Sequence, residues 1–216
     1  MGVNQFMKQE VARLRDENEL LKTEVYALRH YIDSIQALID AVDDLDPDSE
    51  VMPLLDRTLF NAQTVVNATE GSLLVLDEEV GELVFVLVRG DYIEQLQGRR
   101  MPVSKGIAGW VVRNQQPSIV NNAPADDRFY AGIDQSLQFS TQSILAVPII
   151  GRGRVLGVIE VLNKQDGQPF DEIDQSLLMV LCRLAGDVLY MMLEQEEADQ
   201  TSAQMDIEPT ETPFPD

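Results

Sequence analysis

The stretch VLGVIEVLNKQDGQPFDEIDQ, residues 155–175, decides the fold class, because it changes from strand chemistry to helix chemistry across a single turn. Residues 155–162 are apolar at nearly every position and rich in β-branched side chains, which favours a strand covered on both faces. Asp166-Gly167 then predicts a turn, Pro169 restricts the approach to the helix, and Asp171 is placed to cap it. The sequence therefore predicts a β-strand followed directly by a helix.

Further apolar, β-rich runs separated by turn residues fill the middle of the chain. Residues 72–76 and 83–88 flank a charged turn, and residues 143–150 and 155–162 flank Gly151-Arg-Gly-Arg154. Both pairs have the pattern of a β-hairpin, so we expect a mainly antiparallel sheet. Because the strands are apolar on both faces, we expect helices to cover one face, and further chain or a ligand the other. The sequence predicts an α+β domain over residues 44–197.

A long connection and a long helix frame this sheet. Residues 121–142 form an irregular segment, whose length is typical of lids and binding loops. The closing helix, expected at about 171–197, carries two adjacent apolar stripes. One stripe is expected to cover the sheet and the other to meet a partner subunit or the N-terminal helix. Residues 198–216 are rich in proline and acidic residues, which predicts a disordered acidic tail.

Residues 1–43 have the pattern of a coiled-coil helix. Apolar residues recur at alternating spacings of three and four, which forms one seam with a period of about 3.5 residues. The seam contains Val11, Leu14, Asn18, Leu21, Val25, Leu28, Ile32 and Ile35, followed by Ile39 and Val42. It predicts a homodimer that associates through this helix. A breaker cluster at 43–49 ends the seam, and a second helix is expected at roughly 50–67.

Charges beside the seam indicate a parallel dimer. Acidic residues precede the first core positions Val11, Asn18 and Val25, and basic residues follow the second core positions Leu14, Leu21 and Leu28: Glu10, Glu17, Glu24, Arg15, Lys22 and Arg29. A parallel pair in register brings each glutamate to the basic residue five positions on in the partner, whereas an antiparallel pair brings like charges together. Asn18 agrees, because one buried amide at a first core position specifies two-stranded register. The alternative is a long helix that folds back onto its own domain.

Composition limits the partners of the chain. Its 216 residues include 16 basic and 37 acidic ones, and the resulting net charge of −21 repels phosphate backbones and anionic lipid. No apolar run approaches the roughly 20 residues of a membrane span, and the N-terminus lacks the features of a signal peptide. Cys182 is the single cysteine, in agreement with a reducing compartment. We expect a cytoplasmic protein that binds neither nucleic acid nor membrane.

Motifs distributed along the chain, in this order, resemble those of the GAF domain family. They are Glu70-Gly-Ser-Leu-Leu-Val-Leu-Asp77, Gly106-Ile-Ala-Gly-Trp110, Asp127-Arg-Phe129, Ser143-Ile-Leu-Ala-Val-Pro148 and Gly157-Val-Ile-Glu-Val-Leu-Asn-Lys164. The resemblance runs from about Ile39 to Glu196. It implies a GAF/PAS-like fold, with a six-stranded antiparallel sheet, helices on one face, and loops on the other face that enclose a pocket. Across the family such pockets take cyclic nucleotides, tetrapyrroles, haem or small metabolites, or have no known ligand.

The opening stretch also contains most of a motif found in cyclic-nucleotide-binding members of the family. Asn163, Lys164, Phe170 and Asp174 match this motif, while Gln175 replaces its final glutamate. Lys164 and Asp174 can form an ion pair that ties the strand end to the helix start, and Phe170 can fill the turn beneath them. Ordinary turn and capping chemistry explains the same residues, so the stretch indicates the fold more strongly than the ligand.

The pocket implied by the resemblance has a defined set of candidate ligand contacts. They are Trp110, Asp127, Arg128, Phe129, Tyr130, Asp134, Phe139, Thr141 and Ser143, which offer stacking and directed hydrogen bonds. Trp110 and Phe129 suit a core position as well as a contact. Apart from Cys182 on an apolar stripe, the domain has no histidine or cysteine for iron, haem or a covalent bilin. We expect no metal and no resident cofactor, and a small molecule such as a cyclic nucleotide stays a candidate ligand.

Two functions are compatible with these observations. No residue set suits nucleophilic or phosphoryl chemistry, so we expect no catalysis. The favoured function is a regulatory homodimer that senses a small molecule and passes the signal to a separate output partner through its helices. The alternative is a dimeric adaptor without a ligand. A sensor predicts a cavity with polar groups beneath residues 121–142, whereas an adaptor predicts that aromatic side chains fill it.

Overall fold

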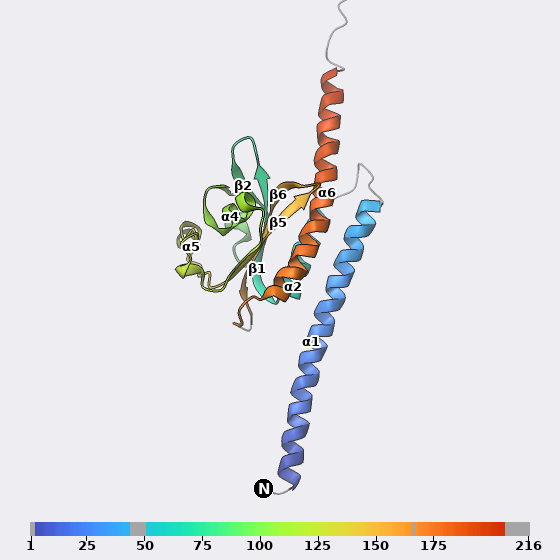
Figure 1. Ribbon diagram of the computed structural model, residues 1–216, viewed down its shortest axis with the longest axis vertical. Helices are drawn as coiled ribbons and strands as arrows, with labels where there is room; N and C mark the ends of the chain where they lie inside the picture. Colours follow the sequence, from blue (N-terminus) through green and yellow to red (C-terminus); the bar gives the residue numbers. More distant parts are fainter. Residues whose placement is uncertain (1–2, 44–50, 166, 206–216) are drawn as a thin grey trace, which may run out of the picture.

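An antiparallel sheet forms the centre of the computed structural model, which describes residues 3–43, 51–165 and 167–205 (Figure 1). The strands are β1 (Ala68–Asp77), β2 (Glu82–Arg89), β3 (Arg100–Pro102), β4 (Ser118–Val120), β5 (Ile144–Gly151) and β6 (Arg154–Lys164). They form a six-stranded sheet in the order β3-β2-β1-β6-β5-β4, and every neighbouring pair is antiparallel. The predicted fold class and both predicted hairpins are confirmed.

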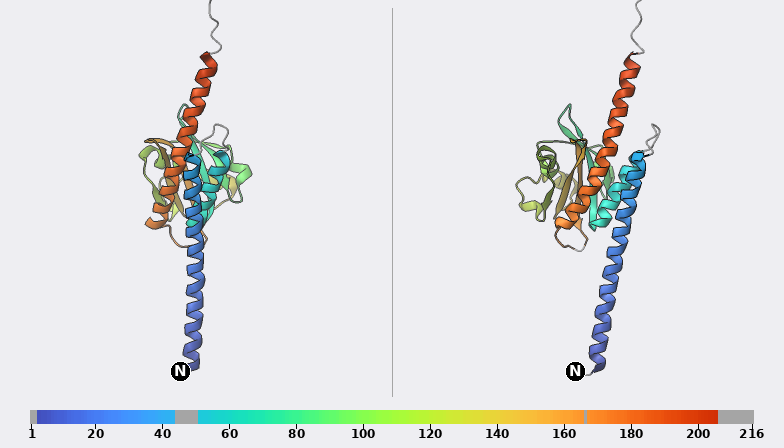
Figure 2. Two further views of the ribbon diagram at one scale, coloured as in Figure 1. Left: turned by 90° about the vertical axis from the view of Figure 1, so that its right-hand side faces the viewer. Right: turned by 45° about the vertical axis from the view of Figure 1, so that its right-hand side comes forward.

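Long helices cover one face of this sheet and short ones the other. The helices are α1 (Val3–Asp43), α2 (Val51–Val65), α3 (Ile93–Leu96), α4 (Gly106–Asn114), α5 (Gly132–Leu137) and α6 (Glu172–Met205), with a 3₁₀ turn, η1, at Ala123–Ala125. α2 and α6 pack on one face, and α1 lies along both of them (Figure 2). α4 and α5 belong to the connections on the opposite face.

The sheet separates two hydrophobic clusters. Leu73 of β1 and Ile159 of β6 are register partners that face α2 and α6. The next pair, Leu74 and Val158, faces α4. Because side chains alternate between the faces of a strand, this arrangement requires apolar residues at consecutive positions. It explains why the strand segments are apolar almost throughout.

α6 contacts β5 directly at a pair of glycines. A Cβ atom on Gly186 would lie 2.3 Å from the carbonyl oxygen of Ile150, and one on Gly151 would lie 2.2 Å from the carbonyl oxygen of Gly186. Both distances are far below van der Waals contact, so no larger residue fits without displacing backbone. The backbones of helix and strand therefore touch at this point.

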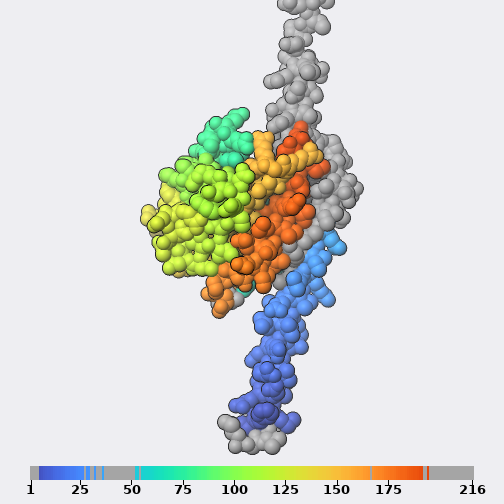
Figure 3. All heavy atoms as spheres, in the orientation of Figure 1, coloured from blue at the N-terminus to red at the C-terminus, as the bar shows by residue number. Residues whose placement is uncertain are grey.

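α1 is continuous over the segment predicted as a coiled coil. Its N-terminal part projects beyond the globular domain (Figure 3). Within the part of α1 whose side chains are described, the apolar seam residues keep 48–53% of their surface exposed: Val11, Leu14, Leu21, Val25, Leu28 and Ile32. The side chain of Ile35 lies outside the described residues. The C-terminal part of α1 contacts α2 and α6, so the helix also packs on its own domain.

α6 differs from the prediction in its length and in its buried face. The helix continues to Met205, past the expected end at 197, because residues 198–205 include good helix formers and extension needs no new nucleation. Its buried positions draw on both predicted stripes, because Leu181 and Val188 belong to one and Leu178, Cys182 and Ala185 to the other. The expected division into one stripe for the sheet and one for a partner is therefore not observed. Residues 206–216 of the predicted tail, and residues 44–50, lie outside the described residues.

Candidate functional site

A cavity of about 90 Å³ lies on the sheet face opposite α2 and α6. Strands β1, β2 and β6 contribute to its floor, and α5 with the neighbouring residues 129–141 contributes to its cover. Its aromatic lining is Phe85, Tyr92, Phe129, Tyr130 and Phe139. Its polar side chains include Glu70, Ser72, Asp134, Thr141 and Glu160. The cavity thus lies beneath the predicted lid and combines stacking surfaces with hydrogen-bonding groups.

Glu160 provides a carboxyl group in the cavity floor. It lies in β6 opposite Ser72 of β1 and Ala146 of β5. The backbone N–H of Ala108, in the first turn of α4, donates a hydrogen bond to this carboxyl group. Burial raises the pKa of Glu160 to about 7, because a charged carboxylate is poorly solvated there. Near neutral pH the group can therefore either donate or accept a hydrogen bond.

Asp134 links two parts of the lid segment by hydrogen bonds to Thr141. Its Oδ2 accepts a hydrogen bond from the backbone N–H of Thr141 at 2.8 Å, and its Oδ1 accepts one from the Thr141 hydroxyl at 2.8 Å. The ring of Phe139, within the same loop, meets the edge of Tyr92 at a centroid distance of 5.2 Å. Asp134 lines the cavity, and both of its carboxylate oxygens already hold the loop in place.

The opening near β1 and β2 carries Glu70 and Arg89. Burial raises the pKa of Glu70, and the Thr69 hydroxyl donates a hydrogen bond to its carboxylate. The guanidinium of Arg89 binds both carboxylate oxygens of Asp56, each at 2.8 Å, and lies 4.8 Å from the ring centroid of Phe60. Asp56 of α2, which lies outside the cavity lining, therefore neutralises the charge of Arg89.

Four of the predicted contacts lie outside the cavity lining. The Arg128 guanidinium pairs with Asp126 at 2.7 Å and lies 4.6 Å from the ring centroid of Trp110. Asp127 is exposed, and the backbone N–H of buried Ser143 donates to Asn163 Oδ1 at 3.2 Å. Trp110, Asp127, Arg128 and Ser143, predicted as ligand contacts, are therefore not part of the lining of this cavity. Phe129, Tyr130, Asp134, Phe139 and Thr141 do line the cavity.

Sequence reasoning missed the floor of the cavity. Glu70, Ser72, Phe85, Tyr92 and Glu160 line it without having been predicted as contacts. One signal was available for Glu160, because it is the charged residue within the apolar run 155–162. A charge in a strand that is covered on both faces indicates a site, since burial of a carboxylate needs a specific reason.

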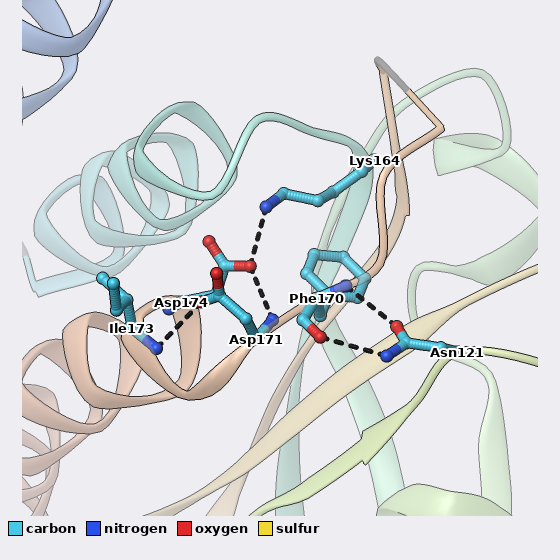
Figure 4. A network of polar contacts seen from close by, with 6 residues as sticks. All are labelled: Asn121, Lys164, Phe170, Asp171, Ile173 and Asp174. Atoms are coloured by element: carbon cyan, nitrogen blue, oxygen red, sulfur yellow. Dashed lines mark hydrogen bonds and ion pairs between the residues drawn. The ribbon is translucent and has the colours of Figure 1, made fainter.

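The motif at the end of β6 forms a compact polar network (Figure 4). Lys164 Nζ lies 2.7 Å from Asp174 Oδ2, and the two side chains keep 13% and 9% of their surface exposed. Buried Phe170 lies beside this pair, with its ring centroid 5.8 Å from the ammonium. Asn121 exchanges two hydrogen bonds with the Phe170 backbone, at 2.8 and 3.0 Å. The expected ion pair and filled turn are present, outside the cavity lining.

Asp171 and Asn163 complete the network at its two ends. Asp171 Oδ1 accepts hydrogen bonds from the backbone N–H groups of Ile173 and Asp174, at 2.8 and 3.0 Å, which is the expected cap of α6 (Figure 4). Asn163 has a left-handed backbone with φ of 51°. Its Oδ1 accepts from Gln142 N at 2.8 Å, and its Nδ2 donates to Ser140 O at 3.2 Å. Asn163 therefore ties the end of the lid to the end of β6.

An antiparallel sheet with a lidded cavity on one face and long helices on the other is the arrangement of a sensory domain. A family model of the GAF domain matches residues 50–189. The chain therefore belongs to the GAF domain family. The GAF domain of a phosphoenolpyruvate-protein phosphotransferase from Acinetobacter has the same fold, with a TM-score of 0.63 and 22% identity over 77% of this chain and 97% of that one.

Curated relatives include cyclic-nucleotide phosphodiesterases. The probable 3',5'-cyclic phosphodiesterase pde-5 of Caenorhabditis elegans is 34% identical over 135 residues, which cover 57% of this chain and 18% of that protein. The dual 3',5'-cyclic-AMP and -GMP phosphodiesterase 11 of Drosophila melanogaster is 29% identical over 169 residues, which cover 72% of this chain and 12% of that protein. The chain thus spans less than a fifth of the length of either relative.

Two kinds of feature are absent from the described residues. Among the side chains that the structure describes, no group of three or more histidine, cysteine, aspartate or glutamate residues is placed to hold a metal ion. Within the same part of the chain, no helix combines the length and the apolar character needed to cross a membrane.

Proposed function

We propose that this chain is a regulatory GAF module that binds a small planar molecule in the cavity beneath residues 129–141. The observation that carries the proposal is the pairing of aromatic walls with the Glu160 carboxyl on the cavity floor. The relatives named as cyclic-nucleotide phosphodiesterases make cyclic nucleotides the first ligand class to test. This proposal includes a cytoplasmic location.

The residues of the cavity have distinct roles in this proposal. The rings of Phe129 and Phe139 stack against a flat ligand, because aromatic faces bind planar groups with little loss of side-chain freedom. Glu160 and Ser72, which are neighbours across β1 and β6, supply hydrogen bonds to the ligand edge. A ligand with N–H donors suits this floor, because the donors can bind the Glu160 carboxyl group. Arg89 is the one basic residue among the described residues of the cavity lining, and it is paired with Asp56.

Ligand entry requires the lid to move. The cavity measures about 90 Å³, whereas pockets for ligands of drug size are roughly 300–1,000 Å³. Residues 129–141 are the part of the cover that can yield, because Asp134, Thr141 and Asn163 hold it by a small number of hydrogen bonds. Occupancy would thus be coupled to the position of the lid, and through Asn163 to the end of β6 and the start of α6.

The role we propose is binding and signalling without catalysis. α1 and α6 both contact the helix side of the domain and both extend beyond it, so they are the elements that would carry a change of state to a separate output partner. The coupling needs only a ligand that prefers one arrangement of lid and helices over another.

A second candidate is a ligandless adaptor. It is favoured by the small volume of the cavity and by its lining of Phe85, Tyr92, Phe129, Tyr130 and Phe139, which come close to filling it. Under this alternative the same helices make protein contacts and the cavity has no ligand.

Calorimetry with cyclic GMP and cyclic AMP, together with native mass spectrometry of the gently purified chain, tests the proposal. We expect one ligand per chain, an affinity at least tenfold weaker in Glu160→Gln and Phe139→Ala, and no change in the control Asp127→Asn, whose side chain lies outside the cavity. A chain that retains no ligand and binds neither nucleotide would support the adaptor. Equal losses in Asp127→Asn and Glu160→Gln would place the binding site elsewhere.

A further inference from the structure

The two sides of α1 have different surroundings. Thr23 and Tyr26 border a hollow that they share with Phe60 and Thr64 of α2. At about 100° per residue, Thr23 and Tyr26 lie roughly 170° and 130° from the centre of the apolar seam. The domain therefore holds α1 by the side opposite the seam. The left panel of Figure 2 views the molecule from the side on which α1 lies. In this view α1 is the outermost layer, and no described element covers its outward side.

The seam has the surface relief of a coiled-coil strand. Val11, Leu14, Arg15 and Asn18 border a hollow on α1 itself. Four residues at these heptad positions form the hole that receives one side chain from a facing parallel helix. From Val11 to Ile32 the described seam is about 32 Å long at 1.5 Å per residue.

Four of the six charges that flank the seam are left available for a second chain, and the other two pair within α1. The ion pairs that α1 forms within its described part are Glu10 with Arg13 and Lys22 with Glu19. Arg15, Glu17, Glu24 and Arg29 form none with any side chain that the structure describes. In a parallel pair in register, Glu10 meets Arg15, Glu17 meets Lys22 and Glu24 meets Arg29 of the partner, so every flanking contact is attractive.

We propose that α1 binds α1 of a second copy of this chain, parallel and in register along residues 11–32, with the two GAF domains on opposite outer sides of the resulting coiled coil. Three observations specify this occupant: the complementary charges, the exposure of the described seam from Val11 to Ile32, and the attachment of the domain to the far side of the helix. Asn18 sits at a first core position, where it meets its own copy and fixes the register. The inference is independent of whether the cavity binds a ligand.

Light scattering on the full chain tests the association. We expect twice the chain mass for the natural sequence and the single-chain mass for the double variant Leu14→Glu/Leu21→Glu. Leu20→Glu is the matched control, because Leu20 is a leucine of the same helix with 61% of its surface exposed but lies off the seam. It should stay dimeric. A natural chain of single mass overturns the proposal, as does equal dissociation of Leu20→Glu, and a double variant that stays dimeric assigns the dimer to another surface.

Cysteine cross-linking tests the orientation. Oxidation should join two copies of Asn18→Cys, because parallel register places the two thiols together. Asp16→Cys, on the opposite side of the same helix, should give no cross-link at the same chain concentration. Cys182, the natural cysteine present in both variants, is buried, so we expect it to form no cross-link. For a chain of doubled mass, two results refute the parallel register. In one, Asp16→Cys cross-links and Asn18→Cys does not; in the other, neither variant cross-links. Far-ultraviolet circular dichroism verifies that each variant is folded.

Discussion

Removal of the Asp174 carboxylate is expected to destabilise the domain more than removal of its partner Lys164. Asp174 Oδ2 accepts hydrogen bonds from Lys164 Nζ at 2.7 Å and from the backbone N–H of Asp171 at 3.0 Å. Asp174→Ala leaves an ammonium group on a side chain that is only 13% exposed. Lys164→Met leaves the carboxylate in the first turn of α6, where the Asp171 N–H and the helix dipole stabilise its charge.

These contacts give the size of the effect. An uncompensated buried charge costs about 3–5 kcal/mol, and we take the lower end, about 3 kcal/mol, for Asp174→Ala because neither side chain is fully buried. Lys164→Met loses one charge-assisted hydrogen bond but keeps an apolar stem, so we expect about 1–2 kcal/mol. At about 2–4 °C per kcal/mol for a chain of this size, Asp174→Ala lowers Tm by roughly 6–12 °C.

Urea unfolding at one fixed chain concentration, followed by circular dichroism, measures the difference. Glu78→Ala is the matched control, since Glu78 pairs with Arg154 at 2.8 Å but about half of each side chain is exposed, 48% and 49%. An exposed pair is worth about 0–1 kcal/mol. The double variant Lys164→Met/Asp174→Ala should cost less than the sum of the single variants. The reasoning is refuted if Asp174→Ala costs no more than Glu78→Ala, or if Lys164→Met is the more damaging change.

Two further predictions concern the cavity and its lid. The pKa of Glu160 rises from 4.5 to about 7 on burial, so the folded chain binds a proton that the unfolded chain has lost, and stability falls as pH rises between these values. In urea unfolding at pH 4.5 and pH 8, the natural chain should therefore lose about 3 kcal/mol relative to Glu160→Gln, and parallel pH profiles would contradict this. Asn163→Gly keeps the left-handed backbone but removes the hydrogen bonds to Ser140 and Gln142. Hydrogen exchange of the Gln142 backbone N–H should therefore be about tenfold faster. An unchanged exchange rate would show that Asn163 does not hold the lid.

The elements that follow from local chemistry were predictable from the sequence. The turn after β6, the Asp171 cap and the Lys164–Asp174 pair depend on residues within a dozen positions of one another. The α6 boundary was harder, because residues 198–205 are polar and their helical state depends on continuity with the packed part of the helix. The two sides of α1 also required the structure, since only the fold shows which side meets α2.

The cavity was predicted in place but only in part in composition. Phe129, Tyr130 and Phe139 come from the lid, which its length marked as functional. Glu160, Ser72 and Tyr92 come from the sheet and its edges, where the face of a side chain depends on strand register across residues far apart in the chain. Trp110 and Arg128 lie outside the lining, where they form a cation–π contact that sequence spacing does not reveal.

The direct backbone contact between Gly151 and Gly186 determines how α6 can move. A helix normally rests on a sheet through side chains, whose rotamers absorb small displacements. Here no side chain lies between the two backbones, so α6 cannot approach β5 more closely at this point, and any tilt of the helix would have to turn about it. At 1.5 Å per residue the arm from 186 back to 172 is about 21 Å and the arm on to 205 about 28 Å. In such a tilt Gly186 would be the pivot, and a small displacement near Asp174 would become a larger, opposite displacement at Met205.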